Sequence, residues 1–237
     1  MVAIFAVLTF LFFILVDYLV LNIQGKPHPA LPSLATEAKR IGFRGIDVEL
    51  PDNVYYSDWH TWVSKNKYGL AKVGVDDFIL KALGPISVTN SAEPGNIVSA
   101  GDVLFEGKVN GSSIEFRSPI DGIVRFVNFN EKDNIIKKAY NDWQMSLIPA
   151  SYRDNTRALI QPEDARNWIK GECRRLRKFL SRSFPAENPA GITMYDGGKS
   201  VAGAAGLLGP AGIEEFKEQF LSTSRRIQNA EREGNFI

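Results

Sequence analysis

An almost wholly apolar run, residues 2–23, constrains the architecture of this chain more than any other feature. Its only ionisable side chains are those of Asp17 and Tyr18. About 20 such residues in a helix cross a hydrocarbon layer of about 30 Å. No Lys or Arg precedes the run and no small-residue cleavage site follows it, which favours an anchor over a signal peptide. We expect a transmembrane anchor over residues 1–24.

Basic residues follow the predicted span but do not precede it, and they include Lys26, Lys39 and Arg40. Positive charge favours the cytoplasmic side. We therefore expect a single-pass protein of a bacterial inner membrane, with the N-terminus outside and the C-terminal domain cytoplasmic. Asp17 within the span either contacts another protein chain or the lipid headgroups, or snorkels or is protonated.

Residues 25–50 contain three prolines and are interpreted as an extended tether between the anchor and the first folded domain. A short helical turn over residues 34–40 would be marginal in isolation.

Sparse cysteine and histidine exclude several kinds of site. Cys173 is the only cysteine, so the chain has no internal disulfide and no cysteine-ligated iron–sulfur cluster. With only His28 and His60 besides, a zinc site made by this chain alone is disfavoured. The net charge of +1 does not favour nucleic acid as the main partner. We expect no cofactor in this chain.

Residues 51–150 show short β-rich runs separated by turn residues, at positions 69–75, 102–109 and 122–129. Between the first two runs, residues 76–84 carry apolar side chains at helical spacing and end in glycine. The pattern predicts a compact, mainly β fold with one short amphipathic helix.

The same region resembles the glycine cleavage system H protein, a member of the lipoyl/biotinyl domain class. The resemblance begins with YYSDWHTWV (55–63) and continues through GLAKVGVDDFILKALGPI (69–86) and PGNIVSAGDVLFEGKV (94–109). It ends with SPIDGIVRFVN (118–128) and DWQMSLIP (142–149). The resemblance implies a lipoyl-like barrel-sandwich hybrid, a flattened β-barrel with two pseudo-symmetric halves.

The resemblance also implies where a lipoyl group would be attached. In that family a lysine at a hairpin tip, seven residues before the serine of a Ser-Pro pair, carries the arm. Counting back from Ser118 leads to Gly111, which has no amine. Asn110 and Gly111 form a dipeptide typical of a tight hairpin turn. Lys108 is the atypical alternative, three positions earlier, where we expect it to lie in a strand rather than at the tip.

His60 and Trp62 allow two interpretations, a ligand or stacking site and ordinary core packing. Packing is favoured, because an aromatic-rich first strand usually covers the sandwich and a lone histidine is a poor metal site.

Residues 151–237 extend beyond the resemblance. Residues 162–184 predict an amphipathic helix with Pro162 and two acidic residues in its first turn and a basic flank. The basic flank either lies on anionic lipid or stays solvated while the apolar face packs on its own domain or on a partner.

A Gly/Ala-rich stretch follows over residues 188–212, and it is a candidate docking segment. Its Gly-Gly-Lys-Ser lacks the first glycine of a phosphate loop. Residues 213–232 predict a last helix. Two such helices rarely bury enough apolar surface alone, so we expect a partner surface to complete them.

Three classes of function are compatible with these features. The first is a non-catalytic structural or assembly subunit of a membrane-bound multisubunit complex, by analogy a respiratory or photosynthetic electron-transfer complex. The second is a membrane-anchored lipoyl-type carrier that uses an unusual lysine. The third, an enzyme, is disfavoured because no nucleophile–base pair, acid pair or metal cluster is recognisable. The expected partners are other subunits and membrane lipid.

Overall fold

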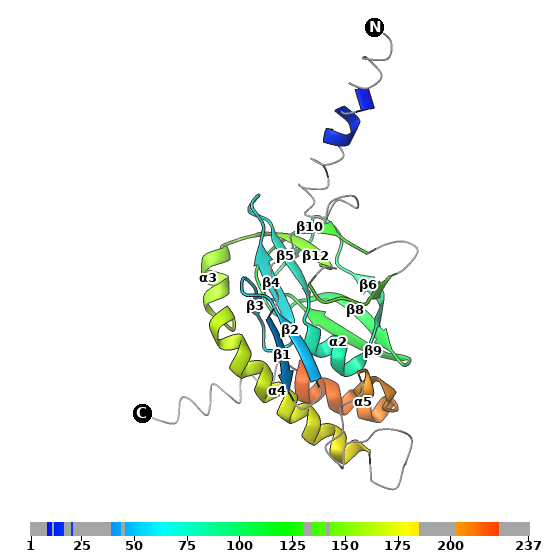
Figure 1. Ribbon diagram of the computed structural model, residues 1–237. Helices are drawn as coiled ribbons and strands as arrows, with labels where there is room; N and C mark the ends of the chain where they lie inside the picture. Colours follow the sequence, from blue (N-terminus) through cyan, green and yellow to red (C-terminus); the bar gives the residue numbers. More distant parts are fainter. Residues whose placement is uncertain are drawn as a thin grey trace.

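The protein is described by a computed structural model over residues 9–10, 12–16, 20, 39–43, 46–129, 134–140, 143–184 and 202–222 (Figure 1). Within these residues, no helix has both the length and the hydropathy needed to cross a membrane. Most of the predicted anchor, Asp17 included, lies outside them.

Two antiparallel sheets form the body, as the mainly β pattern predicts. The larger sheet has the order β3 (Tyr55–Tyr56), β4 (Thr61–Lys65), β5 (Ala71–Val75), β12 (Met145–Pro149), β10 (Gly122–Val127) and β7 (Ile97–Val98). The smaller sheet has the order β11 (Ile135–Ile136), β6 (Ile86–Ser91), β8 (Val103–Val109) and β9 (Ser112–Arg117). Alternating apolar side chains from both sheets meet in one core that includes Val73, Leu104, Phe116, Val124 and Leu147.

The short helix predicted at residues 76–84 is confirmed as α2 (Asp77–Leu83). The Asp76 side chain caps its N-terminus by accepting a hydrogen bond from the Ile79 amide, and Gly84 ends it with φ of 82°. However, α2 does not have the solvent-exposed face that an amphipathic surface helix would have. Five of its apolar side chains are buried, because later and earlier parts of the chain cover it on several sides.

One of the segments that cover α2 lies in the predicted tether, and its structure corrects that prediction. Residues 39–50 are not extended linker but form an antiparallel pair, β1 (Lys39–Phe43) and β2 (Ile46–Leu50). Val48 and Leu50 alternate with Asp47 and Glu49, which is a strand pattern that proline-based reasoning overlooked. The Glu49 amide donates a 2.9 Å hydrogen bond to the Asp77 carboxylate, so β2 is attached directly to α2.

The C-terminal extension wraps around the same body (Figure 1). It comprises α3 (Tyr152–Arg157), α4 (Pro162–Ser183), the 3-10 turn η1 (Ala204–Leu207), α5 (Pro210–Phe216) and the π-helical turn η2 (Lys217–Leu221). The helix predicted at residues 162–184 is confirmed as α4. The last predicted helix instead begins at Pro210, inside the glycine-rich stretch. It ends at Leu221, and residues 223–232 lie outside the described part.

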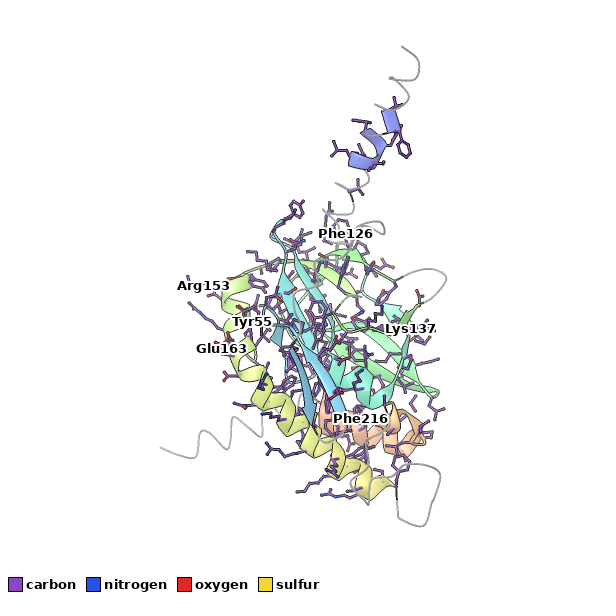
Figure 2. All side chains as sticks on the ribbon, viewed as in Figure 1. Tyr55, Phe126, Lys137, Arg153, Glu163 and Phe216 are labelled. Atoms are coloured by element: carbon purple, nitrogen blue, oxygen red, sulfur yellow. The ribbon has the colours of Figure 1, made fainter. Side chains whose placement is uncertain are left out.

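The apolar face of α4 packs on the body of the same chain. Its buried side chains are Ala165, Ile169, Glu172, Cys173, Leu176, Phe179 and Leu180. Phe179, Phe216, Phe220 and Phe78 join α4, α5, η2 and α2 through ring contacts of 4.7–6.0 Å. Phe216 is buried in this junction, whereas Arg153 and Glu163 are exposed on the outer side of the helices (Figure 2).

The glycine-rich docking segment also finds its surface within the chain. Gly206 of η1 lies against the Leu83 backbone oxygen at the end of α2, where a Cβ would overlap that atom. The Gly203 amide donates a 2.8 Å hydrogen bond to the Lys81 carbonyl. Only a residue without a side chain permits this approach of one backbone to another. The Gly-Gly-Lys-Ser sequence at residues 197–200 lies outside the described part.

Candidate functional site

The hairpin between β8 and β9 has the tight turn that its sequence predicts. Val109 pairs with Ser112, leaving Asn110 and Gly111 as the two turn residues. Their φ angles are 46° and 83°, the left-handed pair that a type I′ turn requires. Both residues are exposed, and a Cβ built on Gly111 would meet nothing within 4 Å. The tip therefore has room for a side chain, but it carries no amine.

Lys108 lies where the sequence places it, in strand β8 and not at the tip. It pairs with Ser113 of β9 and Ser87 of β6, so the backbone on both sides of it is held in the sheet. Its side chain is exposed. Lys108 is thus an accessible amine set back from the turn.

His60 belongs to a fully buried cluster, away from the exposed tip. The chain turns tightly before β4, with the His60 amide donating to the Ser57 carbonyl at 3.1 Å, and His60 takes a left-handed φ of 63°. Its ring stacks between Phe78 of α2, at 4.6 Å, and Trp168 of α4, at 4.9 Å. A strained backbone persists only where its surroundings fix it, and here two rings do so.

Two carboxylates face the His60 ring from different elements. Asp76, at the junction of β5 and α2, has Oδ2 at 2.7 Å from Nδ1 while its Oδ1 caps α2. Glu172 of α4 has Oε2 at 3.8 Å from Nε2, which is too long for a hydrogen bond. Nε2 has no hydrogen-bond partner among the described residues. All three side chains are at most 2% exposed.

Arg175 extends the cluster to the end of the described chain. Its Nη1 lies 2.8 Å from Glu172 Oε2, and its Nη2 donates to the Gln219 carbonyl of η2. The guanidinium also lies over the Phe220 ring, 4.9 Å from its centroid. Asp76, His60, Glu172 and Arg175 therefore alternate in charge and connect the β body, α4 and η2. We call these four residues the buried charge row.

Burial lowers the pKa of His60, but the two carboxylates outweigh this effect, Asp76 more than Glu172, and raise the pKa to about 9. The ring is then an imidazolium at neutral pH. Burial next to the same carboxylates raises the pKa of the Cys173 thiol to about 12, so it is a protonated, buried thiol. The His60, Asp76 and Glu172 side chains are at most 2% exposed, so these three groups hold elements together out of reach of a ligand in solution, whereas the Arg175 side chain, 36% exposed, ends the row at the surface.

Core packing is confirmed for both His60 and Trp62. The Trp62 indole is buried and donates to the carbonyls of Val75, at 2.9 Å, and Ala139, at 3.1 Å. Within the described residues, no group of three or more His, Cys, Asp or Glu side chains could hold a metal ion.

Sequence reasoning missed Glu172 and Arg175, although a signal was present. Glu172 occupies an apolar position of α4, three residues after Ile169 and four before Leu176. A carboxylate at such a position is buried, and a buried carboxylate needs a cationic partner.

The family model for the glycine cleavage H-protein matches residues 54–172, about half of the chain. The chain belongs to this family. The match spans both sheets and continues into α4 as far as Glu172.

Similar proteins come from archaea and bacteria. The probable glycine cleavage system H protein of Pyrococcus furiosus is 26% identical over 127 residues, covering 52% of this chain and 95% of its own length. The H protein of Thermobifida fusca is 37% identical over 81 residues, covering 34% and 64%. The solved H protein of Mycobacterium marinum aligns with a TM-score of 0.40 at 19% identity, covering 51% of this chain and 98% of its own.

Proposed function

We propose that this chain is a non-catalytic structural or assembly subunit of a membrane-bound multisubunit complex, built on an H-protein domain that carries no lipoyl arm. The hairpin tip is the observation on which the proposal rests. An amide-linked arm needs a nucleophilic amine, and the two turn residues are Asn110 and Gly111. The turn geometry is retained without the reactive group.

The C-terminal extension supports an architectural role. The family match ends at Glu172 within α4, whereas this chain continues through the rest of α4 and through η1, α5 and η2, and the buried charge row joins α4 and η2 to the sandwich. A partner that binds α4 or α5 would thereby be held rigidly with respect to both sheets.

An exposed apolar row supports contact with another subunit. Ile123 of β10 pairs with Ile97 of β7 and with Ile148 of β12, so the three side chains lie side by side on the larger sheet. They are 82%, 41% and 45% exposed for Ile97, Ile123 and Ile148. Contiguous exposed apolar surface of this kind is typical of a protein–protein interface, and an apolar surface of a partner subunit fits it.

The proposal places the chain at a bacterial inner membrane, anchored by residues 2–23, with the described body on the cytoplasmic side. The basic residues after the span support this orientation. The class of complex, respiratory or photosynthetic electron transfer, rests on analogy with complexes that contain cofactor-free, singly anchored subunits.

The second candidate function is a lipoyl-type carrier that uses Lys108. Its support is the exposure of that side chain. Against it, the strand pairing on both sides of Lys108 holds the backbone away from the tip position at which the family presents its lysine.

Intact-mass measurement of the native protein, purified from membranes with its partners, tests the proposal. We expect the unmodified mass together with stoichiometric co-purifying chains. A lipoyl mass on any lysine, mapped by peptide sequencing, would refute the first function, and its presence on Lys108 would establish the second. A chain that purifies alone and unmodified would contradict both.

A further inference from the structure

The solvent face of α4 carries positively charged side chains along most of its length. Six cationic side chains recur on the side opposite the buried face, and we call them the cationic face: Arg166, Lys170, Arg174, Arg177, Lys178 and Arg182. At 100° and about 1.5 Å per residue they fall within an arc of about 160° and span about 24 Å. Of the three carboxylates of α4, Glu163 and Asp164 lie at the N-terminal end of the same arc, in the first turn, and Glu172 lies in the core, so that the arc carries no carboxylate from Lys170 to Arg182.

These charges have no partner in the described part of the chain. Arg157, Arg175 and Lys217 each pair with a carboxylate three residues away, but none of the six residues of the cationic face does so among the described residues. A helix of this kind usually interleaves acidic residues, because like charges four residues apart repel each other. Within the described residues, no paired carboxylate therefore neutralises the field of the cationic face.

The attachment of the chain to the membrane lies next to this helix. The first element of the body is β1, and it lies against α4 (Figure 1). Residues 24–38 separate β1 from the end of the predicted span, a stretch of 15 residues that reaches at most about 50 Å when fully extended. The body is thus held within one molecular diameter of the bilayer by a connection that enters on the α4 side.

We propose that the cationic face of α4 lies on the anionic phospholipid headgroups of the membrane to which the chain is anchored. Basic side chains near an anionic leaflet are attracted to it within about a Debye length, and this contact needs no specific pocket. The apolar face of α4 is occupied by the body, so the helix contacts headgroups through its charges and does not insert. This inference rests on the anchor in the proposed function.

The contact orients the body. With α4 on the membrane, the row of Ile97, Ile123 and Ile148, which lies on β7, β10 and β12 and not on α4, is left for a partner subunit. One surface then serves lipid and the other protein.

Energy transfer from α4 to lipid headgroups tests the inference in the full chain. Ser181 is exposed and lies within the cationic arc, so Ser181→Cys accepts a fluorescent donor, whereas Cys173 is buried and stays unlabelled. The labelled chain is incorporated into nanodiscs with a headgroup acceptor, made of phosphatidylcholine alone or with about one third phosphatidylglycerol. We expect several-fold higher transfer in the anionic nanodiscs and its loss at about 0.5 M salt, where screening is nearly complete.

A matched pair of variants separates the cationic face from total charge. Arg166, Arg174, Lys178 and Arg182 changed together to Gln should lower transfer in anionic nanodiscs to the phosphatidylcholine level. The control changes four exposed cations on other elements to Gln, namely Lys67, Lys108, Arg125 and Lys138, and should leave transfer unchanged. Both variants should melt within a few degrees of the parent, because these side chains are solvated.

Four outcomes would overturn the inference. Equal transfer in both lipids, or equal loss in both variants, shows that the cationic face does not recognise headgroups. Unchanged transfer in the cationic-face variant with loss of a co-purifying chain assigns the face to an acidic protein. A chain that fails to incorporate into phosphatidylcholine nanodiscs refutes the anchor in the proposed function, and the inference falls with it.

Discussion

His60 should make the stability of this protein fall as the pH rises from 6.5 to 8.5. The pKa of His60 is about 9 in the folded protein and 6.5 when unfolded. The folded state therefore binds the proton more tightly, so the stabilisation is fully present below pH 6.5 and is lost as the pH rises through 9. At about 1.4 kcal/mol per pH unit, the whole effect is about 3 kcal/mol, of which about 2 kcal/mol disappears between pH 6.5 and 8.5.

The pH range from 6.5 to 8.5 is chosen so that the change in stability comes mainly from the titration of His60. The carboxylates that face His60 are Asp76 and Glu172, and its two stacking partners, Phe78 and Trp168, do not titrate. Cys173 next to Glu172 has a pKa of about 12 when folded and an ordinary value near 9 when unfolded. Measurements that stop at pH 8.5 therefore report mainly on the imidazole.

His60→Gln removes the titrating group and keeps a hydrogen-bonding side chain. Near pH 6.5 the variant should be about 3–5 kcal/mol less stable, because the buried Asp76 carboxylate loses its cation and Glu172 keeps only Arg175. The difference in unfolding free energy between parent and variant should narrow by about 2 kcal/mol by pH 8.5, because only the parent has an imidazolium whose stabilisation is lost as the pH rises. The cost of a left-handed backbone for Gln is the same at every pH and leaves this slope unchanged.

Urea unfolding of the full chain in a nonionic detergent, followed by tryptophan fluorescence, measures the effect. Urea is uncharged and does not screen the ion pairs, and His28 is present in both proteins and cancels in the difference. Glu172→Gln should retain a shallower slope, because Asp76 alone still raises the pKa. If the curves of the parent and His60→Gln run parallel across the window, His60 is neutral in the fold and the reasoning is wrong.

Two further predictions concern glycines. Gly206→Ala should destabilise the chain by about 1–3 kcal/mol in the same urea assay, because its Cβ would overlap the Leu83 backbone oxygen. The control Gly209→Ala, whose Cβ meets nothing within 4 Å, should change stability by less than about 0.5 kcal/mol. Equal effects of the two substitutions would mean that η1 does not dock on α2. Gly111→Lys should fold with a loss of about 1 kcal/mol from its positive φ and remain unlipoylated when co-expressed with a lipoylating enzyme, as intact mass would report; a lipoyl mass would mean that the missing amine is the sole barrier.

The local elements could be predicted because their signals are local. Pro162 and the acidic first turn start α4, Asp76 and Gly84 bound α2, and Asn110 and Gly111 make a turn in which both residues have positive φ. Each of these features depends on residues within a few positions of one another. The position of Lys108 in a strand followed from the same local register.

The β1–β2 pair was missed for a different reason. Prolines at residues 27, 29 and 32 favoured an extended tether over the whole stretch to residue 50, although residues 47–50 alternate between polar and apolar side chains. What fixes β2 is distant in sequence, since the Glu49 amide is held by Asp77 and Val48 is buried against the body. Composition averaged over 26 residues hid a strand of five.

The extension shows that a local pattern predicts a buried face but not the surface that buries it. The apolar face of α4 predicts packing on its own domain or on a partner, and the small residues near Gly206 predict a docking segment. Both surfaces pack on the same chain, α4 through its buried apolar side chains and Gly206 against the end of α2. The contacts that link Asp76 and His60 to Glu172 and Arg175 join residues too far apart in sequence for a short window to reveal. Truncating the chain after β12 would strip Trp168 and Glu172 from a buried imidazolium and leave it with one carboxylate. We therefore expect the sandwich and its extension to unfold as one cooperative unit.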